Sequence, residues 1–220
     1  MEEEKYLQDL INDTYSLEGI KDPKEQEKFK KQFLEMLCVV DDRGNTIGKA
    51  PRGLCHRLGL RHKTVYVLVV SKDGRMLLQQ RGGGIDALFG RLDVAVGGHL
   101  KAGEDDPKLS ACREMREELG ITAEKDRLYL VVEHNRDAPP VITKPFERNR
   151  ERRYLFKYVL TDEEMSELDQ LFSKRESRGE VVSIAWYTVG QVLDVIDRGQ
   201  VADGLLTSFT HYLGERPFRQ

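Results

Sequence analysis

Features of several common protein classes are scarce or missing in this chain of 220 residues. It has three cysteines, without any Cys-x-x-Cys pair, which excludes a disulfide scaffold and a zinc site of four cysteine ligands. Its longest strongly apolar run, Val65 to Val70, is far shorter than the ~20 residues of a membrane-spanning helix. The acidic N-terminal residues lack the apolar core of a signal peptide. We therefore expect a cytoplasmic protein that makes no contact with a membrane.

Neither sign of charge is in large excess. The chain has 35 Lys and Arg against 38 Asp and Glu, so the strongly basic character of many nucleic-acid-binding proteins is missing. Hydrophobic residues make up 39% of the chain, enough to bury a sizeable core. Strand-like segments are interspersed with helical ones, without internal repeats. This order predicts the α/β class, in which helices are layered on a sheet.

The first 37 residues differ from the rest. They are rich in Glu, Lys and Gln, with apolar residues at helical spacing. Asp22 and Pro23 form an N-cap and N1 pair that opens a second helix. We expect a helical arm at 1–37, followed by one domain at 38–220. Packing of the arm on that domain is favoured, and a dimer contact or a lid over the substrate are the alternatives.

After the arm, short apolar segments are separated by turn residues, and helical segments follow later in the chain. A hairpin is expected over 38–48. Further strands are expected at 64–70, 76–80, 92–96, 127–134, 151–160 and 180–187. Helices are expected at 107–119, where Gly120 ends the helix, and at 162–172, 189–198 and 204–213.

The helix expected over 107–119 carries three carboxylates on one face. Glu114 and Glu117 are three residues apart, and Glu114 and Glu118 are four apart. Like charges at these spacings repel by a few tenths of a kcal/mol per pair. A magnesium ion among them would explain this cost, because Mg²⁺ takes oxygen ligands and shares them with substrate phosphates. A solvated acidic face is the alternative.

The residues before this helix favour the metal site. A predicted strand ends at Gly97 and Gly98, and the carbonyl of Gly98 can approach a metal closely because the residue has no Cβ. Glu104, in the following loop, can form a charge-assisted pair with Arg113 and brace the loop against the helix. The neighbouring helix face is expected to pack on the sheet. It carries Ala111, Cys112, Met115 and Leu119.

Together these residues resemble the Nudix box, Gly-x5-Glu-x7-Arg-Glu-U-x-Glu-Glu-x-Gly-U, in which U is aliphatic. The chain departs from the pattern because eight residues, not seven, separate Glu104 from Arg113. Asp106 can cap the helix with Pro107 at N1, so the loop can absorb the extra residue. The matching residues are Gly98, Glu104, Arg113, Glu114, Met115, Glu117, Glu118, Gly120 and Ile121.

Segments outside the box are similar to the Nudix branch of isopentenyl-diphosphate isomerase. They are residues 39–48, residues 55–62 with the pattern Cys-His-Arg-x-Gly-Leu-x-His, and residues 77–81 with the sequence Leu-Leu-Gln-Gln-Arg. The likeness covers most of residues 38–214. It implies a Nudix-like α/β/α sandwich around a mixed β-sheet, to which the helical arm is added.

The resemblance implies a hydrolase that cleaves a diphosphate linkage in a nucleoside diphosphate derivative or a related diphosphate compound. Mg²⁺ or Mn²⁺ would be held by the carbonyl of Gly98 and by Glu114, Glu117 and Glu118. The reaction also needs a general base, for which the box glutamates and Glu151 are candidates. The expected catalytic residues are therefore Glu117, Glu118 and Glu151.

Two arginines are candidate phosphate contacts. Arg81 stands at a strand end, and Arg153 lies in a basic stretch at 144–157 that could steer an anionic substrate. A solvated loop and edge strand are the alternative interpretation of this stretch, and Glu151 would then pair with a neighbouring arginine. A homodimer through the arm and the helix at 204–213 stays open beside burial of both within one subunit.

Two other functions are alternatives to the hydrolase. The isomerase branch uses a Cys directly before the Gly-His of the box, where this chain has Gly97. It also uses paired carboxylates on a later strand, where Glu151 is followed two residues later by Arg153 and not by a carboxylate. That branch binds a second metal ion with histidines and these paired carboxylates, and His56, His62 and His99 are similar to only part of that ligand set. A binding module with the same fold and no catalysis is the other alternative. The complete set of box acids favours the hydrolase.

Overall fold

The computed structural model describes residues 22–81, 90–137, 148–173 and 181–215. The first helical stretch expected in the arm therefore lies outside the described residues. The chain forms two compact units, each described by itself. Unit 1 is drawn from residues 1–63, 101–103 and 135–152, and unit 2 from residues 64–100, 104–134 and 153–220.

Unit 1 contains the second arm helix and the predicted hairpin. Helix α2 (Pro23–Leu34) begins as predicted, because the side chain of Asp22 accepts a hydrogen bond from the backbone N–H of Lys24 and proline occupies the first turn. Strand β1 (Met36–Val40) pairs antiparallel with β2 (Thr46–Pro51), and Val39 pairs with His62 at the start of β3. The hairpin is therefore confirmed.

A short helix that the sequence pattern did not predict follows β2. Helix α3 (Arg52–Leu58) has only seven residues and ends at Gly59, which adopts a left-handed conformation with φ of 66°. It packs beneath α2: a Cβ on Gly53 would stand 2.0 Å from the ring of Phe33, which is 4% exposed. The apolar core of unit 1 consists of Leu37, Val39, Ala50 and Cys55.

Unit 2 is built on a sheet whose central strand is β3 (His62–Val70), which continues into it from unit 1. This strand pairs with β4 (Met76–Arg81), β6 (Val96–His99) and β8 (Arg150–Val159). Strand β4 also pairs with β5 (Leu92–Val94) and β9 (Val181–Tyr187), and β8 also pairs with β7 (Tyr129–Asp137). The strand expected at 92–96 is thus two strands with different partners.

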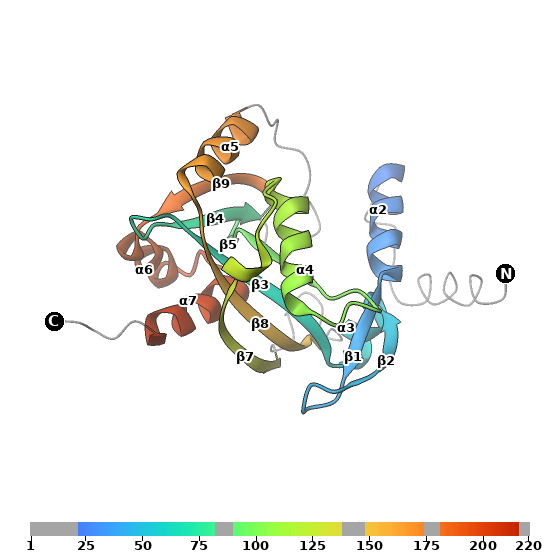
Figure 1. The fold of residues 1–220 in the computed structure, drawn as a ribbon. Coiled ribbons are helices and arrows are strands. Elements are labelled where there is room, and N and C mark those ends of the chain that lie inside the picture. The colour runs from blue at the N-terminus through green and yellow to red at the C-terminus, as the bar shows by residue number, and fades with distance from the viewer. Residues whose placement is uncertain (1–21, 82–89, 138–147, 174–180, 216–220) are drawn as a thin grey trace. The chain divides into compact units, whose positions relative to one another are not determined.

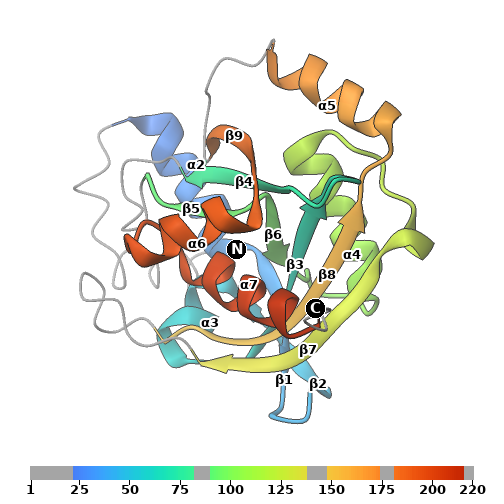
Figure 2. The ribbon, with the colours of Figure 1, turned by 90° about the vertical axis from the view of Figure 1, so that its left-hand side faces the viewer.

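Both faces of this sheet are covered. The alternating residues of β3 divide between two apolar clusters: Val65, Val67 and Val69 belong to one, and Leu68 and Val70 to the other. The first cluster includes residues of α4 (Pro107–Glu114), and the second includes residues of α6 (Val189–Asp197) and α7 (Asp203–Glu215). Helices therefore flank the sheet on two sides (Figures 1 and 2), which confirms the predicted α/β class.

The box helix begins and ends where the sequence predicts, but its second half has another geometry. The side chain of Asp106 accepts from the backbone N–H of Lys108, and Gly120 ends the helix in a left-handed conformation. After α4 the chain forms one π turn, Met115–Leu119. The face predicted to pack on the sheet does so. Ala111, Met115 and Leu119 are at most 2% exposed, and Cys112 is partly buried.

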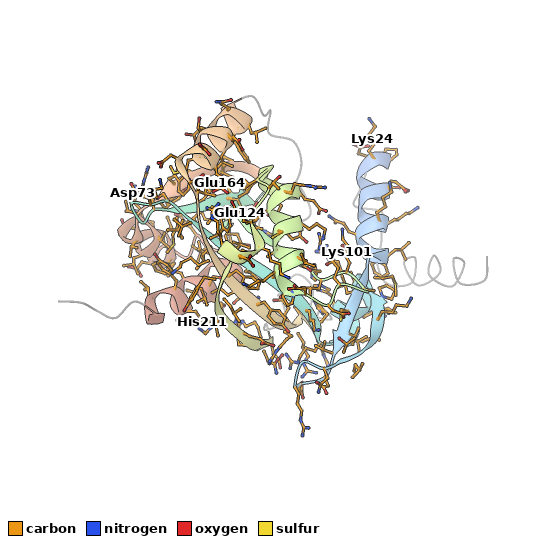
Figure 3. All side chains as sticks on the ribbon, viewed as in Figure 1. Lys24, Asp73, Lys101, Glu124, Glu164 and His211 are labelled. Carbon is orange, nitrogen blue, oxygen red and sulfur yellow. The ribbon has the colours of Figure 1, made fainter. Side chains whose placement is uncertain are left out.

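Helix α5 (Asp162–Ser173) is tied to unit 2 by a polar cluster near its first turn. Arg127 donates two hydrogen bonds of 2.9 Å to Glu164, and the hydroxyl of Tyr158 donates a third over 2.7 Å. The backbone N–H of Glu124 donates to the same hydroxyl; Figure 3 labels Glu124 and Glu164. Among the described helices, none is long and apolar enough to span a membrane.

Candidate active site

Two glutamates of the box helix reach the backbone of β6 in unit 2. Oε2 of Glu118 accepts a hydrogen bond of 3.3 Å from the N–H of Gly97. Oε1 of Glu114 lies so close to the next residue that a Cβ on Gly98 would stand 2.0 Å from it. Only glycine leaves this space to the carboxylate. The two carboxylates therefore meet neighbouring residues of the same strand.

Arg113 links the loop, the helix and the strand. Its Nε and Nη2 donate to the two oxygens of Glu104 over 2.9 and 3.1 Å, and Nη2 also donates to the carbonyl of His99 over 3.0 Å. Nη1 donates to Glu114 over 2.8 Å and to Glu117 over 3.2 Å. The predicted pair of Glu104 and Arg113 thus forms with the eight-residue spacing.

The charge of Arg113 is strongly favoured in this position. Partial burial opposes the charge, but hydrogen bonds and charges of Glu104 and Glu114 outweigh it and raise the pKa of the guanidinium. Glu104 is held from a second side, since the hydroxyl of Ser110 donates to it over 2.8 Å. The loop carboxylate is therefore fixed by two side chains of α4.

The π turn separates the third carboxylate from the other two. A π turn, with i→i+5 hydrogen bonds, contains more residues than the 3.6 of an α-helical turn. Two side chains four residues apart therefore stay on nearly the same face, whereas two side chains three residues apart point to different faces. Glu114 and Glu118 accordingly both meet β6. The side chain of Glu117 is 51% exposed and contacts Arg113, whereas that of Glu114 is 10% exposed.

The donors at this place suit a hard divalent cation. Carboxylate and carbonyl oxygens are the ligands that Mg²⁺ and Mn²⁺ prefer. Glu114 is only 8% exposed as a residue, and it occupies space that any side chain at residue 98 would fill. The arrangement around Gly98 therefore fits the predicted metal ligands Gly98, Glu114 and Glu118, with Glu117 nearer to solvent.

The two predicted phosphate contacts lie in unit 2, on different strands. Arg81, at the end of β4, has a side chain that is 34% exposed, and its Nη1 is 3.1 Å from Oδ2 of Asp93. Arg153, on β8, is 2% exposed, so it does not belong to a solvated edge. Its guanidinium lies 4.3 Å from the centre of the Tyr66 ring, with Nη2 3.6 Å from Asp203.

Sequence reasoning missed the partners of these arginines. Asp93 is 5% exposed in an otherwise apolar strand. A carboxylate between two apolar residues of a predicted strand is the sequence feature that could have indicated a buried, paired acid. In the sequence, Tyr66 is indistinguishable from the other apolar residues of β3. Gly204 fits the helical pattern, which does not show that a Cβ there would stand 2.6 Å from Asp93.

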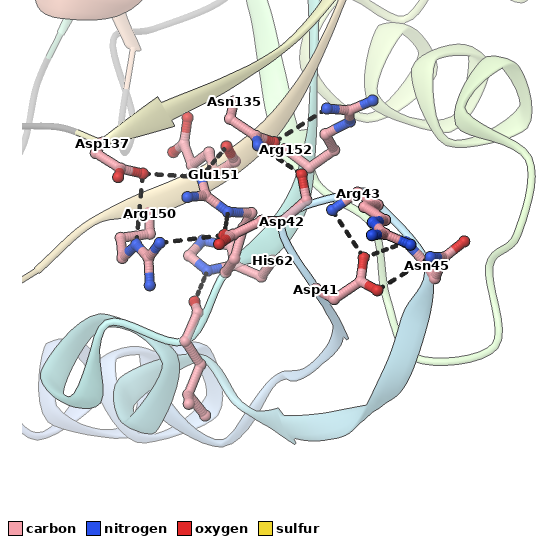
Figure 4. A network of polar contacts seen from close by, with 12 residues as sticks. Asp41, Asp42, Arg43, Asn45, His62, Asn135, Asp137, Arg150, Glu151 and Arg152 are labelled. Carbon is pink, nitrogen blue, oxygen red and sulfur yellow. Dashed lines mark hydrogen bonds and ion pairs between the residues drawn. The ribbon is translucent and has the colours of Figure 1, made fainter.

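Glu151, the other candidate base, belongs to unit 1. It is 3% exposed, and Nδ2 of Asn149 donates to its Oε1 over 2.8 Å. The buried Arg61 donates to the backbone carbonyl of Glu151 and to the carboxylates of Asp42 and Asp137. Figure 4 shows this network, in which Arg150 contacts the same two aspartates.

Two histidines accompany Glu151 in unit 1. Nδ1 of His62 is 2.9 Å from the carbonyl of Leu60, which can only accept, so this nitrogen carries the proton. Burial lowers the pKa of His62, while the negative charge of Glu151 acts in the opposite direction. The ring of His56 lies 5.0 Å from that of His62.

A family model described as the NUDIX domain matches residues 60–206, about two thirds of the chain. The chain belongs to the Nudix family. The match includes the whole box helix and the strands β3 to β9 of its sheet. The crystal structure of DR0079 from Deinococcus radiodurans has the same fold, with a TM-score of 0.53 and 21% identity over 83% of this chain and 100% of that one.

Curated relatives resemble part of the chain. An uncharacterized Nudix hydrolase of Rhodococcus erythropolis, orf19, is 39% identical over 94 residues, which are 42% of this chain and 50% of that protein. An isopentenyl-diphosphate Delta-isomerase of Serratia proteamaculans is 34% identical over 90 residues, 41% and 50% of the two chains. The chain thus spans about half the length of these two relatives.

Proposed function

We propose that this Nudix protein is a divalent-metal-dependent hydrolase that cleaves a diphosphate linkage in a nucleoside diphosphate derivative or a related diphosphate compound. The observation that carries the proposal is the approach of Glu114 and Glu118 to Gly97 and Gly98 of β6. A solvated acidic helix face would leave both carboxylates in water. Here Glu114 is buried and fixed by Arg113.

The carbonyl of Gly98 and the carboxylates of Glu114 and Glu118 would hold Mg²⁺ or Mn²⁺, with Glu117 as the more exposed ligand. Such an ion, when bound, neutralises phosphate charge and lowers the pKa of a coordinated water. Arg113 keeps Glu114 in place and ties the loop residue Glu104 to the same turn. This preorganisation is what a reaction that depends on positioning requires.

The chain must also accept a proton from the attacking water. Water attacks one phosphorus of the diphosphate, the bond from that phosphorus to the bridging oxygen breaks, and the base takes the proton. The candidates for this base are Glu117, which is the more exposed of the box glutamates, Glu118 and Glu151. The choice between Mg²⁺ and Mn²⁺ and a cytoplasmic location stay predictions.

The decisive experiment measures product release from a panel of nucleoside diphosphate derivatives with Mg²⁺ or Mn²⁺. Glu118→Gln should lower kcat by on the order of 10²-fold or more, since a proton acceptor or ligand is lost. Glu167→Gln, on the exposed surface of α5, is the matched control and should leave kcat unchanged. Turnover that survives both Glu118→Gln and chelation of the metal contradicts the proposal.

The isomerase of Serratia proteamaculans among the curated relatives favours the isomerase alternative, but the crowding at residue 97 argues against it. A Cβ on Gly97 would stand 3.2 Å from two ring carbons of Tyr66, which is a tight contact, so a thiol side chain there would have to push the ring aside. Incubation with isopentenyl diphosphate tests this alternative by NMR. A shifted double bond would support the isomerase, and tight diphosphate binding without any turnover would support the silent module.

A further inference from the structure

The ring of Tyr66, on β3 in unit 2, fills a space that two glycines leave open. A Cβ on Gly97 would stand 3.2 Å from two carbons of the ring, and a Cβ on Gly204 would stand 2.9 Å from one of the same carbons. Close-packed interiors do not absorb an added methyl group at such distances without displacement of a neighbour. The ring therefore lies against the backbone of β6 and against the first turn of α7.

The guanidinium of Arg153, on β8, holds the same ring from its face. It lies 4.3 Å from the ring centre, which is a cation–π contact, and Arg153 is 2% exposed. Its Nη2 is 3.5 Å from the hydroxyl of Tyr66 and 3.6 Å from Oδ2 of Asp203, the first residue of α7. Such contacts are stronger where water is excluded. Three elements thus confine the ring.

The ring is joined to the box carboxylates through a single residue. Tyr66 and Gly97 lie opposite each other in the antiparallel pairing of β3 and β6. The N–H of Gly97 donates the bond of 3.3 Å to Oε2 of Glu118. The next residue is Gly98, whose missing Cβ leaves room for Glu114. A displacement of β6 at Gly97 would therefore move both places where these carboxylates meet the strand.

We propose that Tyr66 is a positioning residue for the metal site: its ring, stacked on Arg153, sets the position of Gly97 and thereby the orientation of Glu118. The inference rests on the proposed function for the identity of the bound ion. Groups that orient metal ligands without touching the metal change metal affinity by roughly 10- to 100-fold when they are altered. A rigid ring confined by three elements can transmit its position to the strand beside it.

The test measures the affinity of the full chain for Mn²⁺ without substrate, from the electron paramagnetic resonance signal of free Mn²⁺. Gly97→Ala should weaken binding by about tenfold, because the confined ring cannot yield to the new Cβ and β6 has to move. Tyr66→Leu removes the ring and should weaken binding by a similar factor, whereas Tyr66→Phe keeps the ring and should bind as the wild type does. In the Tyr66→Leu background, Gly97→Ala should cause little further loss.

Matched controls come from the same unit. Tyr129→Leu removes a ring that also faces a cation, Lys157 at 5.0 Å, and among the described contacts none joins Tyr129 to β6, so Mn²⁺ affinity should not change. Gly190→Ala, whose Cβ would meet only Thr188 at 4.0 Å, controls for the added methyl group. Arg153→Lys keeps the positive charge but loses the planar group that stacks, and it should weaken Mn²⁺ binding by about threefold or more.

The thermal midpoint of each variant separates positioning from a merely structural role, with binding measured well below that midpoint. A lowered midpoint with wild-type Mn²⁺ affinity in Tyr66→Leu and Gly97→Ala overturns the inference, and so do strictly additive losses in the double variant. A wild-type chain that binds no Mn²⁺ overturns it together with the proposed function. Non-additive losses in a chain that binds Mn²⁺ but hydrolyses no diphosphate uphold the positioning role and remove the hydrolase.

Discussion

Oε1 of Glu114 lies in the space that a Cβ on Gly98 would occupy, only 2.0 Å from its ideal position. This contact joins the helix half of the Nudix box to its first glycine, which is 16 residues earlier in the chain. It also explains why the box needs glycine here, since every other side chain would push Glu114 away from β6. The carbonyl and the carboxylate can then serve one cation.

Gly98→Ala is therefore expected to lower kcat/KM for hydrolysis by on the order of 10- to 100-fold, through displacement of a metal ligand. The measurement is steady-state hydrolysis together with the thermal midpoint of unfolding. Gly48→Ala on β2 is the control, because its Cβ would meet nothing within 4 Å. Equal activity of the two variants would show that Glu114 does not need this space.

The loop before the helix contains one residue more than the Nudix pattern, and the exposed Asp105 lies in coil next to the capping residue. Glu104→Ala removes both hydrogen bonds to Arg113 and should reduce kcat/KM by about tenfold or more. Deletion of Asp105 should be tolerated better. Parallel activity measurements on the two variants decide this, and the reverse order would contradict the view that the extra residue is slack.

The cluster at α5 predicts a dependence of stability on pH. Burial acts to raise the pKa of Glu164, but hydrogen bonds from Arg127 and the N–H of Thr161 outweigh it, so the pKa is lowered. A carboxyl group with a lowered pKa in the folded state stabilises the protein above its unfolded pKa of ~4.3, and this contribution is lost as the pH falls through the folded pKa.

Glu164→Gln should therefore destabilise the protein by roughly 1–2 kcal/mol at pH 7, with a smaller difference as the pH falls below about 4. Urea unfolding of both proteins between pH 3 and pH 7 measures this difference. Glu167→Gln, on the exposed face of the same helix, should change stability little at any of these pH values. A constant difference for Glu164→Gln across the range would exclude the ionic contribution.

Local signals determined much of the fold. Asp106 with Pro107, and Gly120, fix the two ends of the box helix through capping and a left-handed residue, and each acts within a few residues. The apolar run in β3 predicted a strand for the same reason. Helix α3 was missed because seven residues, one of them Gly53, give too short a helical pattern to recognise.

Features set by distant contacts were beyond the sequence pattern. The box motif predicted which carboxylates gather, but the π turn that keeps Glu114 and Glu118 on β6 and turns Glu117 outward has no local signature. The environment of Asp93 is assembled from β4, β5 and α7, so only the folded chain shows it. Its burial reflects tertiary packing rather than local preference.

The last prediction concerns the packing of α2 on α3 within unit 1, at Phe33 and Gly53. In an open helix, replacing glycine by alanine stabilises by about 1 kcal/mol. In α3 the added Cβ would stand 2.0 Å from the Phe33 ring, so Gly53→Ala should instead destabilise the protein by roughly 1–3 kcal/mol in urea unfolding. Gly190→Ala, whose Cβ would meet only Thr188 at 4.0 Å, should be neutral or stabilising.

The clash can be relieved by removing its partner. Phe33→Ala alone should cost about 3 kcal/mol or more, because the ring is 4% exposed in the folded protein. In that background, Gly53→Ala should no longer destabilise and should approach the gain expected for an open helix. Strict additivity of the two substitutions would mean that α2 does not rest on α3 in solution, and the arm would then be available for the dimer contact or the lid that the sequence left open.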